Sequence, residues 1–289
     1  MSQFLEGTGV ALVTPFTETG AIDFDGLTNL VNFNIDGGVE YLVVLGTTGE
    51  SVTLSKQEKQ LVTNHIIKVN NKRVPLVLGV GGNNTVAIAE DASKVNRLDF
   101  DAILSVVPMY NKPSQEGIFQ HYKVIAEAAS LPILIYNVPG RTGVNMAAET
   151  TLRLAKIDNI IGIKEATGDI TQVLKILKDA PKDFLVISGD DMLALPLVTA
   201  GGHGVITVVG QGYPKEFSQM IQLGLKAENK KAYDIHYKLV DVTEYAFEEG
   251  NPVGVKAILA SNGICGSAVR LPLIEASDVL KKKIEDFKI

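Results

Sequence analysis

Cysteine, tryptophan and histidine are scarce in this chain of 289 residues, which has 1 Cys, no Trp and 4 His. The single cysteine, Cys265, has no partner within the chain, which argues against the disulfide-stabilised folds of secreted proteins. No cluster of Cys and His has the spacing of a zinc site, and we therefore expect no metal centre.

Long apolar runs and an excess of basic residues are also missing. No stretch of about 18 consecutive apolar residues is present that could form a membrane-spanning helix. The 27 Lys and Arg are outnumbered by 33 Asp and Glu, and the net charge of -6 gives no general attraction to nucleic acid or anionic membranes. Residues 1–6 lack the basic and apolar segments of a secretory signal. These features predict a cytoplasmic globular protein with no nucleic-acid or membrane partner.

The chain does contain a regular alternation of short apolar runs with longer segments of helical periodicity. Each run has the length and β-branched composition of a buried parallel strand. Eight such strands predict an α/β fold, specifically a (β/α)₈ TIM barrel. An open doubly wound sheet is the alternative, which the strand count and even spacing disfavour. The expected strands cover residues 9–13, 41–45, 75–80, 102–107, 132–136, 160–164, 184–188 and 204–208.

The segments between the strands predict helices, and the pattern changes after the eighth strand. Ser55 with Glu58 three residues later is typical of a capping box at a helix start. After residue 212 only helical periodicity remains, from which we expect about three helices. The predicted organisation is a catalytic barrel over 1–212 and a helical region over 213–289. The expected barrel helices cover residues 24–37, 55–70, 85–97, 115–129, 147–155 and 171–178.

Lys164 is the most informative residue because it ends the apolar run at 160–163. Burial at a strand end disfavours the charged ammonium form. A neutral lysine amine is a nucleophile toward carbonyls and can form a Schiff base. The alternative is a lysine that leaves the core and is solvated.

Other polar residues follow the neighbouring strands, and in a barrel these strand ends meet at one face. Thr47 and Thr48 are either turn residues or ligands of a small carboxylate. Tyr136 is either a core tyrosine or a proton-transfer group. Arg141 is either solvated or a bidentate carboxylate clamp. The adjacent Asp190 and Asp191 favour an N-cap for a helix that starts near residue 192, rather than a metal site.

Four motifs carry a resemblance to a known family. They are GTTGE at 46–50, YNVPGRTG at 136–143, GIKEAT at 162–167 and SGDD at 188–191. In this order and spacing they resemble the pyruvate-dependent class I aldolase and lyase family, which includes N-acetylneuraminate lyase. The likeness runs over nearly the whole chain. It is strongest to the branch of the family that condenses pyruvate with L-aspartate 4-semialdehyde in lysine and diaminopimelate biosynthesis.

The resemblance implies a role for each motif residue of a lyase that needs no metal or organic cofactor. Lys164 would form the Schiff base with pyruvate, and Tyr136 would move protons at that centre. Thr47 and Tyr110 would extend the proton relay, with Tyr110 supplied by a neighbouring subunit of a dimer or a dimer of dimers. The remaining substrate-binding groups would be Thr48 and backbone near Gly189 and Ile206 for the pyruvate carboxylate, and Arg141 for the carboxylate of the aldehyde.

The chain departs from the family pattern at several positions. Met109 stands where a second tyrosine is common, and Gly254 replaces the second proline of an Asn-Pro-x-Pro stretch. Many relatives are inhibited by lysine at an interface site. Ser51 and Asn83 match that site, but two histidines are replaced by lysines, a glutamate by alanine and a tyrosine by methionine. The replaced positions are Lys56, Lys59, Ala87 and Met109. We therefore expect no inhibition by lysine.

Three other functions compete with this interpretation. A sugar-acid lyase of the same family is disfavoured by Arg141, since a cation suits a carboxylated aldehyde better than a polyhydroxy chain. A non-catalytic barrel that binds a keto acid would have no use for the reactive lysine and its hydroxyl partners. A phosphate-binding barrel isomerase needs a phosphate loop after the seventh or eighth strand, which the glycines at 201–204 do not supply.

Overall fold

Eight parallel strands close into a barrel in the computed structural model, which describes residues 3–289. Each strand pairs with its neighbours in the sequence, and β1 pairs with β8 to complete the circle. The TIM barrel is confirmed, and the doubly wound alternative is wrong. The strands are β1 (Gly7–Ala11), β2 (Tyr41–Val44), β3 (Leu76–Gly79), β4 (Ala102–Val106), β5 (Ile133–Asn137), β6 (Ile160–Glu165), β7 (Leu185–Ser188) and β8 (Gly204–Thr207).

The strands are buried on both faces, which explains why their sequences are almost continuously apolar. In β5, Leu134 and Tyr136 belong to the cluster inside the barrel, whereas Ile133 and Ile135 pack in the cluster between strands and helices. Alternate side chains of a strand point to opposite faces, so the same alternation decides which polar residues face the interior.

A glycine and a tyrosine fill the barrel interior near its base. Tyr41 is fully buried, and a Cβ on Gly9 would lie 2.1 Å from its ring. Only glycine at position 9 therefore leaves room for the tyrosine. This packing makes the barrel a filled core whose open space lies at the C-terminal ends of the strands.

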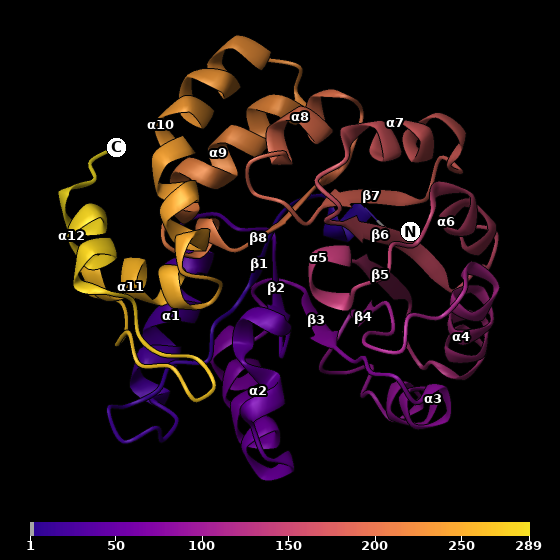
Figure 1. Ribbon diagram of the computed structural model, residues 1–289, viewed down its shortest axis with the longest axis horizontal. Coiled ribbons are helices and arrows are strands. Elements are labelled where there is room, and N and C mark those ends of the chain that lie inside the picture. The colour runs from indigo at the N-terminus through magenta and orange to yellow at the C-terminus, as the bar shows by residue number, and fades with distance from the viewer. Residues whose placement is uncertain (1–2) are drawn as a thin grey trace.

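Helices surround the barrel (Figure 1). The predicted capping box is confirmed, because the Ser55 side chain accepts from the Glu58 backbone and the Glu58 carboxylate accepts from the Ser55 backbone. The helices are α1 (Phe24–Asp36), α2 (Lys56–Asn70), α3 (Thr85–Ser93), α4 (Gln115–Ala128), α5 (Pro139–Thr142), α6 (Ala148–Leu154), α7 (Ile170–Asp179) and α8 (Ala194–Thr199). None of the helices in the described part of the chain is long and apolar enough to cross a membrane.

The C-terminal helices lie together on one side of the barrel, in orange to yellow in Figure 1. They are α9 (Pro214–Leu225), α10 (Asn229–Glu248), α11 (Val253–Ser261) and α12 (Asp278–Asp286). Phe217 and Leu239 from this region share one apolar cluster with Ala194 and Val205 of the barrel. The helical region therefore packs continuously against the barrel, and a domain boundary at residue 212 stays a prediction.

Two helix predictions differ from the structure. The helix expected over 85–97 ends at Ser93, because Asn96 hydrogen-bonds to the Leu98 backbone and the Asp99 carboxylate in a local turn. The C-terminal region has four helices within the described residues, where about three were expected. The additional break falls at Ala227, which has a φ of 58° and no glycine or proline beside it to mark the end of α9.

Candidate active site

Lys164 and Tyr136 lie side by side at the C-terminal ends of two neighbouring strands. They are register partners in the parallel pairing of β5 and β6. Because side chains alternate along both strands, both side chains point into the barrel. The Lys164 Nζ lies 4.3 Å from the centroid of the Tyr136 ring. The pairing that the motifs suggested is therefore a consequence of the strand register.

The environment of Lys164 favours a nucleophilic amine. The residue is 4% exposed, and its Nζ forms no hydrogen bond or ion pair with any of residues 3–289. Burial lowers the pKa of Lys164 to about 8, with Asp191 opposing the shift and Arg141 adding to it. A substantial fraction of the amine is therefore neutral near physiological pH.

Gly189 provides the space that the Lys164 side chain occupies. A Cβ at position 189 would lie 2.8 Å from the Cε of Lys164, which is much closer than an ordinary carbon–carbon contact. The Gly189 backbone N–H donates to the Glu165 carbonyl at 2.7 Å, which fixes the loop after β7 against the end of β6. Glycine is required here for close approach rather than for turn geometry.

Tyr136 keeps its proton near neutral pH. Burial raises the pKa of Tyr136 to about 12, while Arg141 lowers it and Asp191 raises it further. A protonated phenol next to an amine can give a proton to a leaving hydroxide and take one back.

A cavity of about 360 Å³ opens above these two side chains at the C-terminal face of the barrel. Its volume suits a small-molecule site. Six of the eight residues predicted from the sequence line it, namely Thr47, Thr48, Tyr136, Arg141, Lys164 and Gly189.

The other two predicted residues, Tyr110 and Ile206, do not line this cavity. Tyr110 is 89% exposed on the loop after β4, and its side chain does not reach the cavity of its own chain. Ile206 is fully buried on β8 in the layer of side chains inside the barrel. Val208, two residues further on, reaches the cavity instead.

Asn251 joins the two groups predicted to bind carboxylates, and it was not among the residues predicted for the site. Its Nδ2 donates to the Thr48 Oγ1 at 3.0 Å, and its carbonyl accepts from the Arg141 Nη2 at 3.2 Å. Thr48 is buried, whereas Arg141 is exposed at the mouth of the cavity. The Asn251 Oδ1 is buried and has no partner within the described residues. Asn251 is therefore a site residue supplied by the C-terminal region.

Asp191 is a second residue whose position the sequence did not reveal. It is buried and accepts hydrogen bonds from the Thr207 hydroxyl and the Val208 backbone N–H. Burial raises the pKa of Asp191 to about 6, and Lys164 is among the groups that oppose this shift. The predicted N-cap is wrong, because α8 begins at Ala194 with Leu193 as its N-cap and no side-chain cap bond. Asp190 instead accepts from the Met192 and Leu193 backbone N–H groups in the turn before the helix. No group of His, Cys, Asp and Glu in the described residues could hold a metal ion.

A hydrogen-bond network holds the strand ends behind the reactive pair. The buried Glu165 carboxylate accepts from the Asn137 Nδ2 at 3.1 Å, the Gln172 Nε2 at 3.0 Å and the Thr167 backbone at 3.0 Å. Burial raises the pKa of Glu165, and these hydrogen bonds oppose that shift. Asn137 and Glu165 directly follow Tyr136 and Lys164, so the network fixes both strand ends.

A second cavity of about 310 Å³ adjoins the first. Ser51, Lys59 and Met109 line it, and these are three of the positions that the resemblance assigns to a lysine-binding site. Asn83 accepts a hydrogen bond from the Met109 backbone at 2.9 Å. Lys56 lines a neighbouring groove. Lys59 thus lines the same cavity as Ser51 and Met109, whereas Lys56 lines the groove beside it.

Comparison with known proteins identifies the family. The chain matches the sequence model of the Dihydrodipicolinate synthetase family over residues 5–287. The chain belongs to this family. The class I aldolase resemblance of the motifs is thereby confirmed. A similar protein is the 4-hydroxy-tetrahydrodipicolinate synthase of Flavobacterium psychrophilum, which is 56% identical over 282 residues, or 97% of this chain and 96% of that one.

Solved structures of dihydrodipicolinate synthetase family members share the whole fold. A chloride-inhibited dihydrodipicolinate synthase from Acinetobacter baumannii, complexed with pyruvate, has a TM-score of 0.94 at 39% identity and covers 98% of this chain and 97% of that one. A monomeric dihydrodipicolinate synthase variant has a TM-score of 0.95 at 38% identity, with 98% and 96% covered. Family membership makes the chain a lyase of the class I aldolase type.

Proposed function

We propose that this enzyme condenses pyruvate with L-aspartate 4-semialdehyde, as a 4-hydroxy-tetrahydrodipicolinate synthase. The observation that carries the proposal is the unpaired, buried amine of Lys164 beside the Tyr136 phenol in an open cavity. The names of the similar proteins, among them one 56% identical, support the same reaction.

The first step is imine formation. The neutral Nζ of Lys164 attacks C2 of pyruvate, and the resulting carbinolamine loses water to form an iminium ion. Tyr136 donates the proton that allows hydroxide to leave as water. Thr48 and the backbone near Gly189 and Ile206 hold the pyruvate carboxylate in this proposal.

The iminium then makes carbon–carbon bond formation possible. It withdraws electrons from C3, so the methyl group loses a proton and an enamine forms. The enamine C3 attacks the aldehyde carbon, and the new alkoxide takes up a proton. Attack of the amino group of the aldehyde substrate on C2 then displaces Lys164 and closes the ring. The reaction needs no metal or organic cofactor, because the iminium itself is the electron sink.

Protons must enter and leave the buried centre at several of these steps. We assign this relay to Tyr136, Thr47 and Tyr110, with Tyr110 supplied by a second subunit. The exposure of Tyr110 on its own chain agrees with this assignment. We accordingly propose a homo-oligomer, either a dimer or a dimer of dimers, which sedimentation of the purified protein would test. The lone cysteine agrees with a cytoplasmic location.

Arg141 provides the preference for a carboxylated aldehyde. Its guanidinium at the mouth of the cavity can bind a carboxylate through two parallel hydrogen bonds. Activity with pyruvate and aspartate semialdehyde should therefore greatly exceed activity with pyruvate and N-acetylmannosamine. Comparable rates with the two aldehydes would contradict the assignment.

Reductive trapping tests the covalent step directly. Incubation with pyruvate and borohydride should add one pyruvate-derived group, which peptide mass spectrometry should locate on Lys164. Lys164→Ala should abolish the adduct while the protein stays folded, because the side chain faces a cavity rather than close-packed core. An adduct on another lysine, or none, would rule out the mechanism.

A further inference from the structure

The two threonines of the site lie on a turn with unusual backbone geometry. Thr47 and Thr48 lie in one 3₁₀ turn, Thr47–Gly49, between Leu45 with a φ of 56° and Glu50 with a φ of 49°. Both flanking residues lie in the left-handed region, which costs energy for side chains other than glycine. Something outside the turn must therefore hold it in this conformation.

The Glu50 side chain holds the turn together with Thr14, whose Oγ1 donates to the Gly49 carbonyl at 2.7 Å. The Glu50 Oε1 accepts from the Lys256 Nζ at 2.5 Å, and the Glu50 Oε2 accepts from the Arg270 backbone N–H at 3.0 Å. The side chains of Glu50 and Lys256 are 2% and 0% exposed. Lys256 also donates to the Ala268 carbonyl at 2.8 Å, and its Nζ lies 4.2 Å from the centroid of the Phe16 ring. The pair is thus fully desolvated and satisfied by further contacts.

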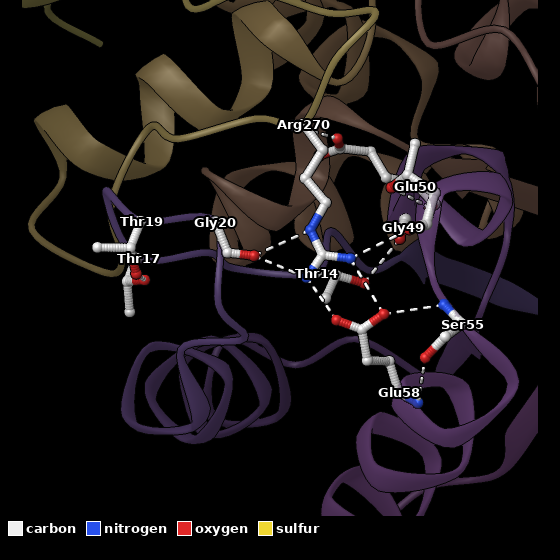
Figure 2. A network of polar contacts seen from close by, with 10 residues as sticks. Thr14, Thr17, Thr19, Gly20, Gly49, Glu50, Ser55, Glu58 and Arg270 are labelled. Atoms are coloured by element: carbon white, nitrogen blue, oxygen red, sulfur yellow. Dashed lines mark hydrogen bonds and ion pairs between the residues drawn. The ribbon is translucent and has the colours of Figure 1, made fainter.

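All the partners of this carboxylate belong to the C-terminal region. Lys256 lies on α11, and Arg270 lies on the segment that follows. The Arg270 guanidinium donates to the Gly20 carbonyl at 2.6 Å and to the Glu58 carboxylate at 2.5 Å, which ties that segment to the barrel (Figure 2). Figure 2 shows Glu50 beside this anchor, on the turn that leads into the helix capped by Ser55.

A second contact from the same region reaches the turn on its cavity side. Asn251, just before α11, donates to the Thr48 Oγ1. The C-terminal region therefore contacts the turn on two sides: through Glu50 on the side away from the cavity, and through Asn251 on the cavity side. From this arrangement we infer that Glu50, paired with Lys256, is a positioning residue for pyruvate: it sets the orientation of Thr47 and Thr48 in the cavity. The inference rests on the proposed function.

A purely structural role for the pair is the competing explanation. A buried ion pair can often be replaced by neutral side chains of similar shape without loss of stability, whereas removal of one partner leaves a costly unpaired charge. The double variant Glu50→Gln, Lys256→Met uses this difference. It keeps the volume, removes both charges and leaves the turn without the carboxylate that accepts from two donors.

The experiment measures the pyruvate concentration that gives half-maximal borohydride trapping on Lys164, together with the melting temperature. We expect the double variant to stay folded but to need about tenfold more pyruvate, the change that corresponds to losing one hydrogen bond to a charged group. The KM for the aldehyde at saturating pyruvate should change little, because Arg141 lies outside the turn. Glu50→Gln alone should show the same pyruvate defect with a lower melting temperature.

Glu58→Gln is the matched control, since it weakens the Arg270 anchor in the same network without touching Glu50. It should lower the melting temperature and leave half-maximal trapping unchanged. A folded double variant with wild-type pyruvate dependence would overturn the inference, and so would a double variant that does not fold, because the pair would then serve only the fold. Absence of trapping in the wild-type enzyme would instead overturn the proposed function, and this inference with it.

Discussion

Gly189→Ala should displace the nucleophile without removing any functional group. Gly189 does not have a positive φ, so alanine can adopt its backbone conformation. The new Cβ would lie 2.8 Å from the Lys164 Cε and 2.8 Å from the Ala166 Cβ. Carbon atoms in contact are normally separated by about 3.5–4.0 Å, so the end of the Lys164 side chain must move by roughly 0.7 Å or more.

A displacement near 1 Å in a reacting group can reduce the rate by about 10²-fold. We therefore expect imine formation in Gly189→Ala to slow by about that factor, measured as the single-turnover rate of borohydride trapping with pyruvate. Gly140→Ala is the control, because a Cβ there meets nothing within 4 Å and the change in unfolded-state entropy is the same. A folded Gly189→Ala enzyme that traps pyruvate at the wild-type rate would refute the argument that this glycine makes room for the amine.

Four further predictions follow from the geometry of the site. Tyr136→Phe removes only a hydroxyl and should lower turnover by ~10²–10⁴-fold with folding intact, and near wild-type turnover would exclude it from the proton relay. Arg141→Ala should weaken use of the aldehyde by about 1.5–3 kcal/mol but spare trapping of pyruvate; equal damage to both steps would indicate a structural role. Burial lowers the pKa of Lys164 to about 8, and the nearby Asp191 opposes that shift, so Asp191→Asn should lower the Lys164 pKa further. Because the neutral amine is the reactive form, the midpoint of the pH profile for pyruvate trapping should then move below 8. An unchanged midpoint would exclude an electrostatic interaction between Asp191 and Lys164. L-lysine should not inhibit the enzyme below about 1 mM, because the site has Ala87 in place of a carboxylate that would pair with the ammonium group, and Lys56 and Lys59 would repel that group. Inhibition at submillimolar L-lysine would show that lysine binds at another site.

Much of the barrel was predictable because its signals are local. A parallel strand covered on both faces must be apolar throughout, and the run at 160–163 shows this whatever surrounds it. The capping box of Ser55 and Glu58 involves residues only three apart, and it appears in the structure as expected. The break at Ala227 between α9 and α10 had no such signal, because a left-handed residue other than glycine is not marked in the sequence.

The sequence by itself determined which residues lie at strand ends, and with them Lys164, Tyr136 and the two threonines of the site. It could do so because strand ends in one barrel face the same cavity, so that position along the chain fixes the approximate place in space. Only the tertiary structure decided the roles of Asn251, Lys256 and Asp191. Asn251 and Lys256 reach the turn after β2 from 203 and 206 residues further along the chain, and no periodicity connects segments so distant. The pKa values of the site were also decided there, because burial is a property of the packed molecule and not of any single segment.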